Sequence, residues 1–111
     1  VKKNLKDISF TRLESWASSG VPDLLCYNKN GVFFTVELKV AIREHVRLSP
    51  HQIAFHVKHP RNSFILKKPP GPCSVKLYPG SMVLELADRK PCSPIAESWP
   101  EVQKIFDSLS M

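Results

Sequence analysis

Two carboxylates and a lysine occur in this sequence in a pattern that suits metal-assisted hydrolysis. Asp23 follows Pro22 at the start of an apolar segment. Glu37 and Lys39 flank Leu38 near the end of the next apolar segment. Oxygen ligands favour Mg²⁺ or Mn²⁺ over zinc, and such an ion activates water and stabilises charge on a phosphate. The alternative is a polar strand face on which Glu37 and Lys39 pair with their neighbours.

The turn between the two segments decides whether the carboxylates meet. Residues 21–27 and 32–40 have the aromatic and branched composition of strands, and Asn28-Lys29-Asn30-Gly31 between them signals a hairpin. A two-residue turn would direct Asp23 away from Glu37. A three-residue loop closed by a left-handed Gly31 would set them opposite each other, about 4.5–5.5 Å apart at Cβ. We therefore predict an odd-length loop or a bulge.

The remaining segments predict a small α/β domain. Ser49 and Gln52 form a capping-box pattern with Pro50 at the first helical position, which predicts a helix ending near residues 59–60. The other expected elements are a helix over 5–18, an irregular basic stretch over 41–48, a strand over 63–67, a hairpin of 75–78 with 82–86, and a closing helix over 99–109. The order α-β-β-α-β-(ββ)-α implies a mixed β-sheet flanked by helices.

Length and composition limit the class of protein. The chain has 111 residues, which is room for one domain spanning 1–111. It carries 16 Lys and Arg against 10 Asp and Glu, a net charge of +6 that favours a polyanion such as nucleic acid. No segment is apolar enough for a membrane span, so we expect no membrane partner. Three cysteines without a CxxC pair favour reduced thiols and a cytoplasmic location.

Four motifs in order resemble the PD-(D/E)XK nuclease superfamily, and more closely its VRR-NUC branch. They are Arg12-Leu13-Glu14, Gly20-Val21-Pro22-Asp23-Leu24, Val36-Glu37-Leu38-Lys39 and Leu48-Ser49-Pro50-His51-Gln52. The resemblance covers about two fifths of the chain, from Arg12 to Phe55. That branch includes stand-alone single-domain proteins of phages and bacteria. The resemblance implies a restriction-endonuclease-like core.

The resemblance also implies roles for individual residues. Asp23 and Glu37 look like metal ligands, with the Leu38 carbonyl as a third, and Lys39 looks like the catalytic lysine. Glu14 resembles an additional acidic residue brought towards the metal, although it can equally be a solvated helix carboxylate. Gln52 resembles a glutamine that follows the core motif, although it can equally be the capping partner of its helix. The implied cofactor is Mg²⁺ or Mn²⁺.

Further residues are candidates for contacts with DNA. Arg43, His45 and Arg47 follow the candidate catalytic strand directly, and Lys67 and Lys68 precede a proline-rich break, so both groups can reach phosphates. The alternative is mobile, solvated loops. The four histidines lack the spacing of a zinc site and are better explained as surface or DNA-contacting groups. We expect five aromatic residues to lie in the core rather than to stack on bases: Trp16, Tyr27, Phe33, Phe34 and Trp99.

The resulting hypothesis is a metal-dependent DNA endonuclease that acts as a homodimer on branched DNA. The resemblance favours four-way (Holliday) junctions, and two symmetric cuts by so small a chain require two copies. Such an enzyme would serve DNA recombination or repair in the cytoplasm, or in the host cytoplasm if phage-encoded. Two alternatives stay open: a nicking or flap endonuclease of repair or replication, and a catalytically idle DNA-binding module of the same fold.

Overall fold

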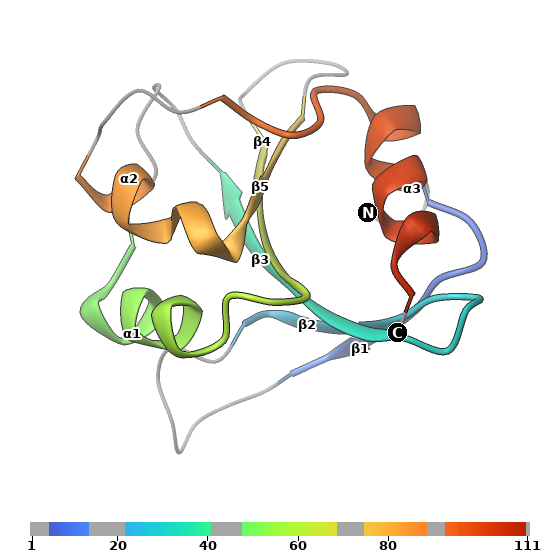
Figure 1. Cartoon of the computed structure of the whole chain (residues 1–111), viewed down its shortest axis with the longest axis horizontal. Helices are drawn as coiled ribbons and strands as arrows, with labels where there is room; N and C mark the ends of the chain where they lie inside the picture. The colour runs from blue at the N-terminus through green and yellow to red at the C-terminus, as the bar shows by residue number, and fades with distance from the viewer. Residues whose placement is uncertain (1–4, 14–21, 41–47, 69–74, 89–92, 111) are drawn as a thin grey trace.

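The structure is a computed structural model that describes residues 5–13, 22–40, 48–68, 75–88 and 93–110. These residues form one five-stranded sheet with helices on both faces (Figure 1). The strands are β1 (Ser9–Arg12), β2 (Leu24–Tyr27), β3 (Phe33–Val40), β4 (Ser63–Lys68) and β5 (Lys76–Pro79); the helices are α1 (Pro50–Lys58), α2 (Val83–Ala87) and α3 (Trp99–Ser108), with a 3₁₀ turn, η1 (Gly80–Met82), before α2.

The sheet is mixed, and its strand order follows the chain, β1-β2-β3-β4-β5. Only the β3–β4 pair is parallel, and the other three pairs are antiparallel. A parallel pair requires a crossover, and α1 lies within the segment that connects β3 to β4. The predicted mixed sheet flanked by helices is therefore confirmed.

Each face of the sheet has its own core. α3 covers one face, where Phe106 packs among Phe34, Phe64 and further apolar residues. α1 and α2 cover the opposite face over β3 to β5, where Ile65 and Val83 belong to a smaller cluster (Figure 1). Because successive side chains of a strand point to opposite faces, Phe34 and Val36 face α3, whereas Glu37 faces α1.

The β2–β3 hairpin has the predicted three-residue loop. The ladder ends at the pair Tyr27–Phe33. Beyond it, the Asn28 amide donates to the Val32 carbonyl at 3.1 Å, and the Gly31 amide donates to the Asn28 carbonyl at 3.1 Å. Gly31 has a φ of 77°, the left-handed conformation expected of the closing residue. The predicted odd-length register is confirmed.

Side chains of this loop bind the end of α3. Asn28 Nδ2 donates to the carbonyls of Phe106 at 2.8 Å and Leu109 at 3.0 Å. Asn30 Nδ2 donates to the carbonyls of Asp107 at 2.8 Å and Leu109 at 3.0 Å. These bonds satisfy carbonyls that a helix end leaves without intrahelical partners. They also fix the hairpin against α3.

The prediction of a helix over 5–18 is wrong for the residues that the structure describes. Residues 9–12 form β1, which pairs antiparallel with β2; residues 14–18 lie outside the described ranges. The segment Ile8-Ser9-Phe10-Thr11 consists mostly of β-branched and aromatic residues, whose χ1 restriction favours strands over helices. Strand pairing therefore outweighed an approximate helical periodicity.

The second predicted hairpin is also wrong in its second arm. β5 forms as expected, but residues 80–87 fold into η1 and α2. Val83 and Leu86 are three residues apart and both buried, which is a helical spacing, and the intervening residues are good helix formers. Ala96 instead pairs with Leu77 on the open side of β5.

The structure bears on the membrane expectation as well. Among its described helices, none has both the length and the apolar character that crossing a membrane requires.

Candidate active site

Asp23 and Glu37 lie side by side where β2 begins and β3 approaches its end. Leu24 pairs with Val36 in the ladder, so Asp23, which precedes Leu24, lies opposite Glu37, which follows Val36. The Asp23 amide donates to Glu37 Oε2 at 3.2 Å, and the Leu38 amide donates to Asp23 Oδ2 at 2.8 Å. The hairpin register thus brings together two carboxylates, as the sequence predicted.

Burial makes the Glu37 carboxyl unusual. Its side chain is 1% exposed, and the pKa of Glu37 is raised to about 8. Desolvation is the largest cause; a side-chain hydrogen bond and the negative charge of Asp23 raise the pKa further, while the positive charge of Lys39 lowers it. The Glu37 carboxyl therefore holds a proton near neutral pH when no cation is bound.

Gln52 joins the lysine to the buried carboxyl. Gln52 Oε1 accepts a hydrogen bond from Lys39 Nζ at 2.9 Å, and Gln52 Nε2 donates to Glu37 Oε1. The same side chain completes the predicted capping box, because Oε1 also accepts from the Ser49 amide at 3.0 Å while Ser49 Oγ accepts from the Gln52 amide at 3.2 Å. Gln52 is therefore the capping partner of its helix, one of the two roles that the sequence left open, and its side chain also ties the start of α1 to the candidate site.

The acidic pair is suited to a divalent ion, although the described residues hold no group of three His, Cys, Asp or Glu side chains that could bind a metal. Glu14, the further acidic candidate, lies outside the described ranges. A cation beside Asp23 and Glu37 would relieve the charge repulsion and desolvation that raise the Glu37 pKa. The oxygen-only donors fit Mg²⁺ or Mn²⁺.

The predicted DNA contacts are described only in part. Arg43, His45 and Arg47 lie outside the described ranges. Lys67 lies in β4, paired in register with Lys39, and is only 5% exposed. Lys68 ends β4 and is exposed. β4 thus continues through the point where the sequence suggested a break, and of the two lysines only Lys68 is exposed to solvent.

One of the three described histidines is buried, where the sequence predicted surface or DNA-contacting groups. His56 is 1% exposed and lies 3.2 Å from Ser63 Oγ, which in turn donates to the His59 carbonyl at 2.6 Å. Burial lowers the pKa of His56. Gly80 packs so closely here that a Cβ at this position would overlap Ser63 Oγ. His56 is therefore a structural residue of the α1 side of the sheet.

Sequence reasoning was wrong about two aromatic residues. Phe33 is 59% exposed and Tyr27 is 42% exposed, whereas Phe34 is 1% exposed, as expected. Trp99 is partly buried against the α3 core, and Trp16 lies outside the described ranges. The signal was present in the hairpin register, which places Phe33 on the face of Glu37 and not on the face of Phe34.

A solved structure shares this fold. The chain is similar to Hjc, a Holliday junction resolvase from the archaeal hyperthermophile Archaeoglobus fulgidus, with a TM-score of 0.56 and 18% sequence identity over 73% of this chain and 69% of that one. The fold is therefore restriction-endonuclease-like, as the sequence predicted. No family model and no curated protein matches the sequence.

Proposed function

We propose that this protein is a metal-dependent DNA endonuclease that hydrolyses phosphodiester bonds in branched DNA, in particular in four-way junctions. One observation carries the proposal. The register of the β2–β3 hairpin brings Asp23 beside Glu37, and Gln52 links Glu37 to Lys39, in a fold shared with a Holliday junction resolvase. The four sequence motifs that resemble the PD-(D/E)XK superfamily, and its VRR-NUC branch, support the same proposal.

Asp23 and Glu37 would hold a Mg²⁺ or Mn²⁺ ion, together with the Leu38 carbonyl and Glu14. When bound, such an ion supplies an activated water and stabilises charge on the phosphate. Lys39, whose Nζ is held by Gln52 Oε1, would orient the water or stabilise the developing charge. Glu37 would release its proton to the solvent as it becomes a ligand, since its pKa of about 8 keeps it protonated in the absence of the ion.

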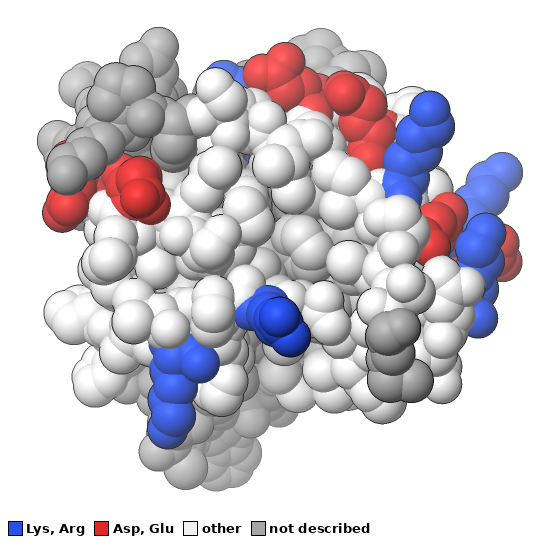
Figure 2. Space-filling model, in the orientation of Figure 1, with Lys and Arg blue, Asp and Glu red and all other residues white. Residues whose placement is uncertain are grey.

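Basic residues around the site would bind the DNA backbone. The described ranges hold 10 Lys and Arg against 8 Asp and Glu, so most of the net charge of +6 belongs to the other segments, Arg43 and Arg47 included. On the face seen in Figure 2, the described Lys and Arg side chains are scattered. We assign the phosphate contacts to Arg43, His45, Arg47 and Lys68. A homodimer in the cytoplasm would make the two cuts that a symmetric junction needs.

Cleavage of a synthetic four-way junction in Mg²⁺, in Mn²⁺ and in EDTA tests the proposal. We expect cleavage with either metal and none in EDTA. Asp23→Ala, Glu37→Ala and Lys39→Ala should each abolish cleavage while junction binding is largely retained. Glu85→Ala, which removes an exposed carboxylate of α2, is the matched control and should cut like the wild type.

The outcomes separate the proposal from its alternatives. Unchanged cleavage by the Asp23 or Glu37 variant would refute the site assignment. Preferential cutting of flaps or nicking of duplex DNA would indicate the repair or replication nuclease instead. Junction binding without cleavage in either metal would indicate a DNA-binding module.

A further inference from the structure

Beyond the candidate site, the same face of β2 and β3 exposes an aromatic pair. Tyr27 and Phe33 are opposite each other in the ladder, with ring centroids 4.6 Å apart and an interplanar angle of 54°. Their exposures of 42% and 59% are high for the open face of an antiparallel sheet, where polar residues are the rule. α1 and α2 cover the other part of this face, over β3 to β5. The pair is therefore an uncovered apolar surface beside the site.

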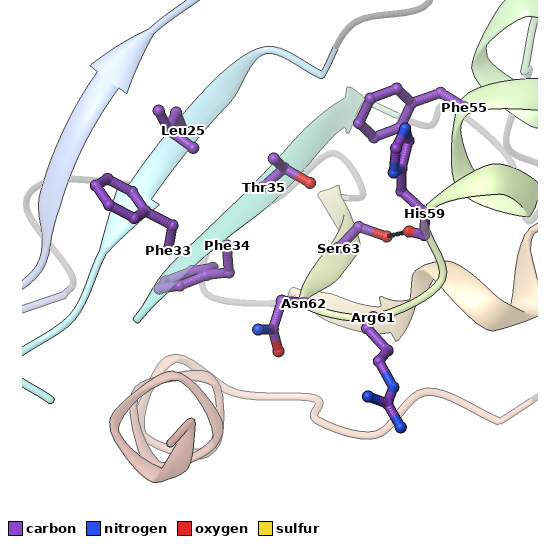
Figure 3. A pocket seen from close by; sticks show the side chains of 9 residues that line it. All are labelled: Leu25, Phe33, Phe34, Thr35, Phe55, His59, Arg61, Asn62 and Ser63. Carbon is purple, nitrogen blue, oxygen red and sulfur yellow. Dashed lines mark hydrogen bonds between the residues drawn. The ribbon is translucent and has the colours of Figure 1, made fainter. Parts of the chain in front are cut away.

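A pocket of about 200 Å³ lies between the sheet, where β2 and β3 carry the aromatic pair, and the end of α1. Phe33 and Thr35 line it from the sheet, and Phe55, His59 and Arg61 line it from α1 and the turn that follows (Figure 3). The rings of Phe55 and His59 lie 4.8 Å apart on their side of the pocket. The pocket thus offers aromatic surfaces from two different elements.

Polar groups accompany these aromatic rings. Thr35 Oγ1 is buried without a hydrogen-bond partner among the described residues, and Asn62 adds an exposed amide to the lining. Arg61 supplies an exposed cation, and none of the nine lining residues is acidic. A ligand with a flat apolar face, hydrogen-bonding edges and an attached negative charge would match this combination.

The exposed area of Tyr27 and Phe33 suits a nucleobase better than a second copy of the chain as the group that covers them. An aromatic side chain buries 150–250 Å² when covered, so the exposed halves of Tyr27 and Phe33 provide roughly 200 Å². A stable protein interface needs about 800 Å² per partner. One or two bases stacked on the rings would cover the pair, whereas a dimer would need several times its area.

The position of the pair relative to the site is consistent with a DNA strand. Phe33 precedes Glu37 by four residues on the same strand face, a distance of about 13 Å along β3. Base–aromatic stacking tolerates any sequence, because every base has a π-face. A strand whose phosphate lies at Asp23 and Glu37 would bring bases a few nucleotides away to this surface.

From these observations we propose that Tyr27, Phe33 and the adjoining pocket bind an unpaired nucleobase, with Arg61 contacting its phosphate. The inference rests on the proposed function in taking DNA as the substrate. It adds that the protein selects DNA in which a base near the cut has left the stack. Extruding a base costs least where pairing is already interrupted, as at a branch point or a bulge.

Binding of two labelled DNA probes in EDTA tests the inference. One probe is a fully paired duplex, and the other is the same duplex with a bulge of unpaired adenines. Phe33→Ala should weaken binding of the bulged probe about tenfold or more and leave duplex binding unchanged. Arg61→Ala should weaken binding of the bulged probe more than that of the duplex.

Val57→Ala is the matched control, because Val57 is a 54% exposed apolar residue of α1 that does not line the pocket. It should bind both probes like the wild type. Thermal unfolding monitored by circular dichroism checks that each variant folds. If a folded Phe33→Ala variant binds the bulged probe as the wild type does, the inference is overturned. It is also overturned if sedimentation shows that Phe33→Ala separates a dimer into monomers, since the face would then join two copies.

These outcomes are independent of the junction assay. Phe33-dependent binding of the bulged probe without metal-dependent cleavage would support the base site and refute the endonuclease. Metal-dependent junction cleavage with unchanged binding by Phe33→Ala would support the endonuclease and refute the base site.

Discussion

The two faces of the sheet differ in what they bury. The α3 face packs an apolar cluster that includes Phe34, Phe64 and Phe106. The α1 face buries Glu37, His56, Ser63 and Lys67 beside a smaller apolar cluster. Burying a polar or ionisable group costs free energy unless its partners compensate, whereas buried apolar surface stabilises. The comparison indicates that the α3 face is stabilised by apolar packing, whereas the α1 face accommodates buried polar and ionisable groups through their hydrogen-bond partners.

Phe106→Ala should produce the largest effect, because it removes the centre of the stabilising face. Phe106 is fully buried, with its ring centroid 4.5 Å from that of Phe34 and 5.3 Å from that of Phe64. We expect a loss of about 3–5 kcal/mol in the free energy of unfolding, measured by urea denaturation. Leu84→Ala, at a 52% exposed position of α2, should change it by less than about 0.5 kcal/mol. A loss below about 1 kcal/mol for Phe106→Ala would show that the apolar cluster of the α3 face is not the main source of stability.

Glu37→Gln should stabilise the metal-free protein at alkaline pH. The folded-state pKa of Glu37, about 8, lies above its unfolded value, so the folded state binds the extra proton and the wild type loses stability as pH rises from about 4.5 to 8. The amide removes that loss, and because each pKa unit corresponds to about 1.4 kcal/mol we expect a gain of a few kcal/mol at pH 8.5. Urea denaturation at pH 5 and pH 8.5 measures it. If the free energy of unfolding depends on pH equally in the variant and the wild type, the pKa of Glu37 is not raised by folding.

The protons released on metal binding provide a second measurement of the protonation of Glu37. Calorimetry at pH 7 in buffers of different ionisation enthalpy should detect proton release when Mn²⁺ binds the wild type. Asp23 keeps its place in the Glu37→Gln variant, but the amide that replaces the Glu37 carboxyl has no proton to release. We therefore expect little proton release from the variant, together with weakened binding.

His56 should make the α1 face sensitive to acid. Burial lowers the folded-state pKa of His56 below its unfolded value of about 6.5, so its contribution to stability is complete above pH 6.5 and is lost as pH falls below it. We therefore expect the free energy of unfolding to fall between pH 7 and pH 5 because of this residue. The measurement belongs in the Glu37→Gln background, because protonation of Glu37 acts in the opposite direction. His51→Gln, at an exposed position of α1, should keep the acid loss, and His56→Gln should remove it.

Gln52→Ala should have the smallest effect on stability and a larger one on catalysis. It removes the capping box of α1, at a cost of about 1 kcal/mol. It also removes the hydrogen bonds to Lys39 Nζ and Glu37 Oε1, so junction cleavage should fall by more than the stability loss explains. Ser49→Ala weakens the same cap without touching the site and is the matched control. Equal cleavage by the two variants would restrict Gln52 to capping.

The sequence predicted best what local chemistry determines. The conformation of Gly31 followed from the loop, and the loop set the register that brings Asp23 to Glu37. Capping chemistry likewise predicted the start of α1 at Pro50. In both cases a few adjacent residues carry the whole signal.

The sequence-based predictions were wrong where contacts with residues far along the chain determine the local structure. The segment that forms β1 has an ambiguous pattern, and its pairing with β2 settles it. The same holds for the helix α2, whose burial of Val83 and Leu86 depends on packing against the sheet. The exposure of Phe33 could have been deduced from the register, but only with knowledge of how far α1 extends over the sheet. Residue type alone assigns Phe33 and Phe34 to the same core.

The contacts between the hairpin loop and α3 constrain the order of folding. Asn28 bonds to carbonyls 78 and 81 residues further along the chain, and Asn30 to carbonyls 77 and 79 residues away. Contacts of such separation carry a loop-closure cost and form after local structure. While the protein is being synthesised, the hairpin therefore lacks these bonds until Leu109 has left the ribosome.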